Sequence, residues 1–102
     1  MLGFNVHLRE VIGELSKQPP EAMIFAERIE GEFRPESTAV VVELSEAEVG
    51  RPIREVAMER APGMDYFLEV FLALDMLNGL RAKGVDLDAI VQRIIYYAER
   101  DA

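Results

Sequence analysis

The 102-residue chain contains no cysteine and only one histidine, His7. The missing thiols exclude disulfides, thiolate metal sites and a cysteine nucleophile. The chain offers no second nitrogen ligand with which His7 could share a metal ion. We therefore expect His7 to be a surface or boundary residue without a catalytic part. A chain without cysteine also suits a reducing compartment, and we expect a cytoplasmic protein.

Motifs for nucleophilic or phosphate chemistry are lacking as well. Ser16, Ser37 and Ser45 do not stand in a GxSxG sequence, and the isolated glycines form no phosphate-binding loop. Asp86 and Asp88 begin a calcium-loop pattern, but apolar residues occupy the later ligand positions. We therefore predict that the protein is not an enzyme and that it has no catalytic residue, no cofactor and no metal site.

No stretch of the sequence is long and apolar enough to predict a membrane span. The most apolar stretch, residues 66–80, is interrupted by Glu69 and Asp75, and a bilayer takes about 20 consecutive apolar residues. The start of the chain, MLGFNVHLREV, lacks the basic-then-apolar order of a secretory signal peptide. Both features agree with a cytoplasmic protein that has no membrane partner.

Basic residues are fewer than acidic residues, 11 against 19, and the formal net charge is −8. Phosphate backbones are repelled by such a surface, so we expect no nucleic-acid partner. Residues 27–50 alone hold seven acids and two bases. An acidic field of this kind either keeps the protein soluble or speeds association with a basic partner. For the second role the candidate residues are Glu43, Glu46 and Glu48, although Ser45 and Glu48 also have the spacing of a helix-capping box.

Hydrophobic periodicity and turn residues predict a small α+β domain. Strands are expected from Ala22 to Ile29 and from Thr38 to Leu44, and the length of the loop between them favours antiparallel pairing. The expected helices are a first one capped by Asn5 and ended by Pro19-Pro20, a second from Pro52 to before Pro62-Gly63, a third from Met64 to Lys83 closed by Gly84, and a last one capped by Asp86.

The expected helix from Met64 to Lys83 is apolar on more than one side. On a helical wheel Leu68 and Leu72 lie nearly opposite the broad apolar face that contains Phe67 and Leu74. A helix of this kind is either central in the fold or shared with a partner. The pattern therefore leaves two alternatives open, a helix packed between the sheet and the last helix, or a surface for self-association.

Two adjacent tyrosines, Tyr96 and Tyr97, stand near the end of the last expected helix. Neighbouring helical residues point about 100° apart, and Tyr97 falls on the apolar arc while Tyr96 falls in the middle of the polar arc. Tyr96 is then either an idle surface residue or an anchor at a protein interface. Tyrosine is favoured as an anchor because it buries a large area and keeps a hydroxyl.

Two stretches, APGMDYFLEVFLALDML at residues 61–77 and IVQRIIYYAERDA at residues 90–102, resemble a group of small bacterial domains of unknown function. The expected opening helix followed by a proline-bounded strand is also similar. Some small acidic proteins of this kind are immunity proteins that neutralise toxins. The resemblance implies a protein-binding role of the immunity or antitoxin type, and it implies no catalytic residues.

Together these observations predict one α+β domain over residues 1–102, with a small antiparallel sheet packed against about four helices. We expect a non-enzymatic protein-binding domain of the immunity or antitoxin type, in which Glu43, Glu46, Glu48 and Tyr96 contact a basic toxin partner. The alternative is a homodimeric structural or regulatory domain that associates through the surplus apolar surface of the helix at 64–83.

Overall fold

The computed structural model describes residues 6–100, which form an α+β fold with a four-stranded antiparallel sheet and four α-helices. The strand order is β1-β3-β2-β4. The strands are β1 (Val6–His7), β2 (Met23–Ala26), β3 (Thr38–Val42) and β4 (Asp65–Glu69). The helices are α1 (Leu8–Gly13), α2 (Ile53–Arg60), α3 (Val70–Ala82) and α4 (Leu87–Arg100), with a short 3-10 turn at Leu15–Lys17. The predicted fold class is confirmed.

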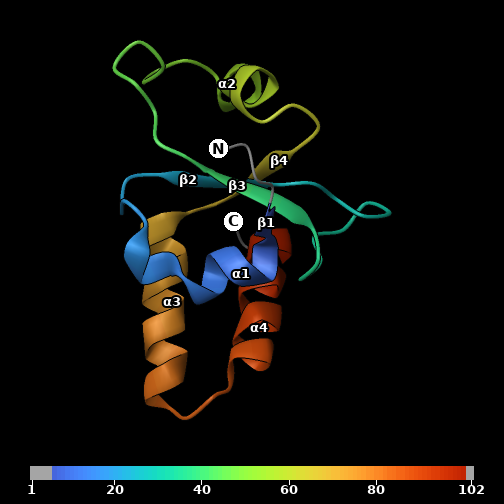
Figure 1. Ribbon diagram of the computed structural model, residues 1–102, viewed down its shortest axis with the longest axis vertical. Coiled ribbons are helices and arrows are strands. Elements are labelled where there is room, and N and C mark those ends of the chain that lie inside the picture. Colours follow the sequence, from blue (N-terminus) through green and yellow to red (C-terminus); the bar gives the residue numbers. More distant parts are fainter. Residues whose placement is uncertain (1–5, 101–102) are drawn as a thin grey trace.

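The sheet separates two helical layers of unequal size. Figure 1 shows α1, α3 and α4 on one side of the sheet and α2 alone on the other. Strands β2 and β3 pair antiparallel as predicted, with Met23 opposite Val42 and Ala26 opposite Ala39. The two outer strands, β1 and β4, were not predicted.

The first predicted helix is shorter than expected. Val6 and His7 pair with β3, so the helical segment begins only at Leu8, and a separate 3-10 turn replaces its last part. Glu10 Oε1 accepts a hydrogen bond from the His7 backbone N–H at 2.8 Å. The exposed His7 therefore stands at the start of α1, and the predicted cap Asn5 lies outside the described residues.

The predicted helix from Met64 to Lys83 is wrong in its first turns. Residues 65–69 form β4, which pairs antiparallel with β2, and α3 begins only at Val70. The register shifts between Ile24 and Phe25, because Ile24 pairs with Leu68 and Phe25 with Tyr66. This β-bulge leaves Phe67 without a partner in the ladder, and both Phe67 and Leu68 belong to the same hydrophobic cluster.

The bulge explains why the apolar pattern at Phe67 and Leu68 resembles that of a helix. In a regular strand consecutive side chains point to opposite faces of the sheet, and two adjacent residues in one core are typical of a helix. Once Phe67 and Leu68 are assigned to a bulged strand, most of the apolar surplus expected of α3 lies inside the fold. Phe71, at the start of α3, remains 53% exposed.

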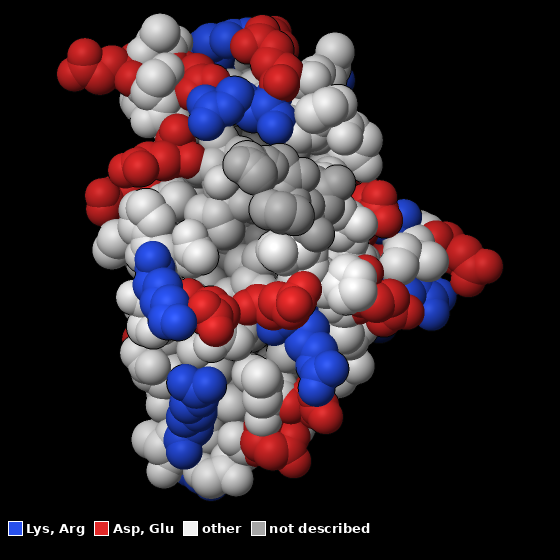
Figure 2. All heavy atoms as spheres, viewed as in Figure 1, with Lys and Arg blue, Asp and Glu red and all other residues white. Residues whose placement is uncertain are grey.

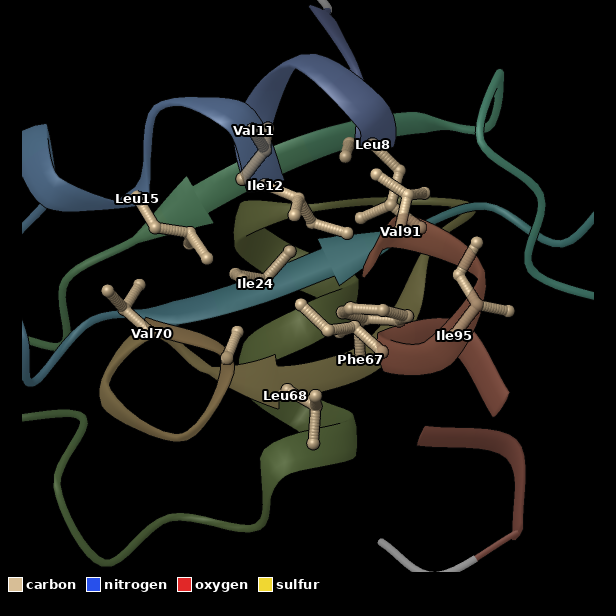
Figure 3. Packing of buried hydrophobic residues seen from close by; sticks show 14 of the residues in the cluster. Leu8, Val11, Ile12, Leu15, Ile24, Phe67, Leu68, Val70, Val91 and Ile95 are labelled. Carbon is tan, nitrogen blue, oxygen red and sulfur yellow. The ribbon is translucent and has the colours of Figure 1, made fainter. Parts of the chain in front are cut away.

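The main core lies between the sheet and the layer of α1, α3 and α4, as Figure 3 shows. Its fully buried large side chains come from every one of these elements, and they include Leu8, Ile12, Ile24, Phe67, Leu68, Leu77, Ile90 and Ile94. A smaller cluster under α2 buries Phe25, Val42, Ala57 and Ala61. The smaller cluster is bordered by partly buried side chains, so α2 covers its face of the sheet less completely.

The turn between α3 and α4 contains the two features predicted from the sequence, a glycine that ends α3 and an aspartate that caps α4. Gly84 has a φ of 81° and its N–H donates to Arg81 O, while the Val85 N–H donates to Leu80 O at 3.1 Å. This is the Schellman arrangement of a helix C-terminus. Asp86 Oδ1 accepts a hydrogen bond from the Ala89 N–H at 2.9 Å and so caps α4. The two helices therefore run antiparallel and pack side by side.

The loop between β2 and β3 contains a tight turn in which Ile29 and Glu32 pair through two backbone hydrogen bonds. Glu30 and Gly31, the two central residues, have φ angles of 55° and 83°. Positive φ at both central positions is the pattern of a type I′ turn, which favours Asn-Gly. Among residues 6–100, Glu30 is the one non-glycine residue with positive φ.

We expect the substitution Glu30→Asn to raise the free energy of unfolding by about 0.5 kcal/mol. Asparagine reduces the cost of the left-handed backbone, about 1–2 kcal/mol for most residues, while the exposed ion pair between Glu30 and Arg34, which is lost, contributes little. Urea unfolding measures the difference. Glu32→Asn removes the same charge two residues away, and equal stability of the two variants would contradict the argument.

Candidate functional site

Tyr96 lies on the solvent side of α4, as its place in the polar arc predicted. The opposite side of this helix is buried in the main core through Ile90, Val91, Ile94 and Ile95. Tyr96 is 59% exposed, whereas Tyr97 is partly buried and packs against the core. The prediction that only one of the two tyrosines faces water is confirmed.

The phenol ring of Tyr96 has a cation as its neighbour. The guanidinium carbon of Arg100 lies 4.9 Å from the ring centroid, one helical turn further along α4. A guanidinium at this distance is attracted by the ring, by about 0.5–1 kcal/mol at an exposed site. The contact favours side-chain rotamers that keep the Tyr96 ring and the Arg100 guanidinium together.

Two hollows of the surface meet at Tyr96. The larger, about 860 Å³, lies between α4 and the turn at residues 31–33, and the smaller, about 380 Å³, lies between α3 and α4. Both are lined by Arg93 and Tyr96. The smaller hollow is also lined by Met76, Leu80, Lys83 and Tyr97. We call the surface formed by Met76, Leu80, Lys83, Arg93, Tyr96 and Arg100 the Tyr96 surface.

Glu99 fixes the turn at residues 31–33 against α4. Its Oε1 accepts a hydrogen bond from Arg28 Nη1 at 2.8 Å, and its Oε2 accepts one from the Phe33 backbone N–H, also at 2.8 Å. Arg28 in turn donates to Asp65 Oδ2 at 2.9 Å, and its guanidinium lies 4.1 Å from the centroid of the Phe33 ring. One carboxylate and one guanidinium therefore join β4, α4 and the loop after β2, and they hold one wall of the larger hollow in place.

These contacts shift the pKa of both charged groups. Burial is the largest single influence on Glu99 and acts to raise its pKa, but the Phe33 N–H and the Arg28 guanidinium together outweigh it, so the pKa lies below its ordinary value of 4.5. The hydrogen bond to Glu99 raises the pKa of Arg28 in spite of partial burial. Both groups are therefore charged at neutral pH.

The three glutamates predicted as partner contacts differ in their surroundings. Glu43 and Glu46 are exposed, and neither makes an ion pair within residues 6–100. Glu48 is only 8% exposed. Its Oε1 accepts hydrogen bonds from the Ser45 N–H at 2.9 Å and from Arg60 Nη1 at 2.6 Å, and these two donors lower its pKa. Glu48 is therefore turned inward and not displayed to solvent. Its hydrogen bond from the Ser45 N–H is one half of the expected capping box, but residues 46–50 form turns and not a helix.

The structure does not place Tyr96 beside these acids. Figure 1 shows the segment 43–51 beside α2, on the opposite side of the sheet from α4. Figure 2 shows acidic side chains gathered on the upper left, over this segment, while acidic and basic side chains alternate over the helices below. The expectation that Tyr96 would anchor a partner beside Glu43, Glu46 and Glu48 is therefore not met in its geometry, while the contact of any of these residues with a partner stays a prediction.

The sequence reasoning missed the bases around Tyr96. Arg93, Tyr96 and Arg100 are spaced three and four residues apart, and this spacing alone places them on one exposed side of α4. Lys83 joins them only through the packing of α3 on α4, which no local pattern shows. Phe33 was also missed. It is buried under Arg28 and makes an edge-to-face contact with Phe67, with ring centroids 5.0 Å apart.

Neither a metal site nor a membrane span is evident in the part of the chain that the structure describes. No three side chains of histidine, cysteine, aspartate or glutamate converge there as metal ligands. None of the helices within residues 6–100 has the length and apolar character needed to cross a bilayer. Comparisons of the chain with protein-family models, curated proteins and solved structures found no match.

Proposed function

We propose that this protein is a non-enzymatic protein-binding domain and that the Tyr96 surface contacts its partner. The observation that supports this function is an exposed aromatic ring, stacked on Arg100, between two hollows. Tyrosine, arginine and methionine are enriched at protein interfaces, and hot spots are typically tyrosine or arginine side chains beside pockets. An immunity-type role, the inhibition of a toxin by binding, is one form of this function.

Photo-crosslinking in the native cell tests the proposal. Replacement of Tyr96 by p-benzoylphenylalanine should give a specific crosslinked partner, because the probe then lies within the contact. The binding constant for that partner should weaken about thirtyfold or more in the substitution Tyr96→Ala, the effect of a typical hot spot. Phe71→Ala provides the control, since Phe71 is exposed to a similar extent on α3. Equal binding by both variants would place the contact elsewhere.

The acid-rich segment supports a second candidate, a basic partner bound on the α2 side. Glu43 and Glu46 are exposed there without ion pairs in the described chain, and Val49 in the same segment is 67% exposed. Acids around an apolar residue fit the basic toxin that the sequence predicted. A photo-crosslinking residue at position 49 distinguishes the two candidates, because only a partner on this side reacts with it.

Self-association remains an alternative with a smaller structural basis. Residues 65–69 belong to the sheet, so the apolar surplus of α3 is reduced mainly to Phe71. A homodimer through this residue predicts a crosslinked product of twice the chain mass from a probe at position 71. Sedimentation of a monomer at high concentration would contradict the homodimer.

A further inference from the structure

The bases of this protein fall into two groups by their ion pairs. Acids outnumber bases by 19 to 11, so a base that lies near the surface readily meets a carboxylate. Six of the bases do so: Arg9, Lys17, Arg28, Arg34, Arg51 and Arg60. The bases with no ion pair inside residues 6–100 are Arg54, Arg81, Lys83, Arg93 and Arg100.

The unpaired bases gather on one part of the molecule. Four of the five lie on α3 or α4 or directly after α3, and Lys83, Arg93 and Arg100 line the hollows that meet at Tyr96. Of the two carboxylates in these linings, Glu99 is neutralised by Arg28, which leaves Glu32 at the rim. The Tyr96 surface is therefore locally positive in a protein with a net charge of −8.

The acids of α4 and of the turn before it do not cancel this charge, because each has a partner elsewhere. Asp86 caps the helix through the Ala89 N–H, and Asp88 pairs with Arg9 of α1 at 3.0 Å. Glu99 is held by Arg28 and Phe33. Within residues 6–100, the cations on the exposed side of α4 and at the end of α3 consequently have no carboxylate that pairs with them.

We propose that the Tyr96 surface binds an acidic segment of a partner protein, one that carries carboxylates together with apolar side chains. This inference rests on the proposed function and names the chemistry of its partner. The carboxylates would meet Lys83, Arg93 and Arg100, and an apolar side chain would lie on Met76, Leu80 and the ring of Tyr96. The partner chemistry is thus the opposite of the basic toxin that we expected from the acidic stretch 27–50 and from the family resemblance.

Charge complementarity favours a short acidic segment over a nucleic acid. A phosphate backbone presents a long line of negative charge that would extend past the three cations toward the acidic remainder of the protein. A peptide places a few carboxylates over the cations and fills the apolar part of the surface with its other side chains. A locally positive surface in an acidic protein also orients such a partner during encounter.

Backbone amide NMR with a defined probe tests the inference. The probe is a 12-residue peptide of glutamate and leucine at helical spacing, compared with the same peptide in which lysine replaces each glutamate. The glutamate peptide should shift the amide signals of the second half of α3 and of α4, and the lysine peptide should not. The double variant Lys83→Glu and Arg93→Glu should weaken binding of the glutamate peptide about tenfold or more.

The control variant is Arg54→Glu. Arg54 lies on α2, on the other side of the sheet, and likewise has no ion pair in the described residues. Arg54→Glu makes one charge reversal where the double variant makes two, so a general charge effect would weaken binding in the control as well, although by less. Such a loss, binding of the lysine peptide at α4, or no binding of the glutamate peptide at millimolar concentration would overturn the inference.

Two further outcomes distinguish this inference from a nucleic-acid partner and from a protein partner that is not acidic. A thymidine oligonucleotide that binds the same amides more tightly than the glutamate peptide would overturn the protein partner in favour of nucleic acid. A natural partner that Tyr96→Ala loses and that the double charge reversal keeps would overturn the acidic partner while the proposed function stands.

Discussion

The substitution Phe67→Ala should lower the free energy of unfolding by about 3–5 kcal/mol, the usual cost of removing a buried phenylalanine. The Phe67 side chain is 1% exposed, lies in the main core and contacts the ring of Phe33 edge to face. Its loss leaves a cavity and removes an aromatic contact worth about 0.5–1.5 kcal/mol beyond the buried area. Urea unfolding followed by circular dichroism measures the change.

The control for this substitution is Phe71→Ala, which should cost less than about 1 kcal/mol because Phe71 is 53% exposed. The comparison also tests the secondary structure. In one continuous helix, residues 67 and 71 lie a single turn apart on the same side and would have similar costs. In the structure the first belongs to β4 and the second to α3. Similar losses in the two variants would therefore contradict the bulged strand.

Residues 66–80 show why local patterns predicted the fold class more accurately than the individual strands and helices. The apolar residues of 66–80 are dense enough to satisfy helical spacing throughout, so nothing local marks the change from strand to helix at Val70. The change depends on β2, which offers its free edge to residues 65–69 through non-local hydrogen bonds. The two central strands were predictable because β-branched residues and turn signals lie within each segment.

The candidate site was predictable to the same limited extent. The exposure of Tyr96 follows from the period of α4, a local property, and the structure agrees. Whether Glu43, Glu46 and Glu48 lie near Tyr96 depends on which side of the sheet the 43–51 segment and α4 occupy. A single sequence does not carry that information. The burial of Glu48 likewise depends on Arg60, twelve residues further along the chain. The acidic stretch 27–50 suggested either solubility or a basic partner, and the local excess of bases around Tyr96 was not predicted.

Glu99→Ala should lower the free energy of unfolding at neutral pH by about 2–3 kcal/mol. The variant leaves the Phe33 N–H without its acceptor and deprives Arg28 of one of its two carboxylates. Hydrogen bonds to charged groups contribute about 1.5–3 kcal/mol, and a partner left unsatisfied adds to the loss. Glu36→Ala is the matched control, because Glu36 is exposed in the same loop and should change stability by less than about 0.5 kcal/mol.

The same residue predicts how stability depends on pH. The folded-state pKa of Glu99 lies below its ordinary value of 4.5, so its contribution is complete above that value and is lost as the pH falls through the lowered pKa. Glu48 and Glu59, whose pKa values are also lowered, act in the same direction in every variant. The stability difference between the wild type and Glu99→Gln therefore isolates Glu99, and it should shrink as the pH falls below 4.5. A difference that stays constant to acid pH would show that the Glu99→Gln variant loses stability only through altered packing. The ion pair between Glu99 and Arg28 would then contribute nothing to the stability of the fold.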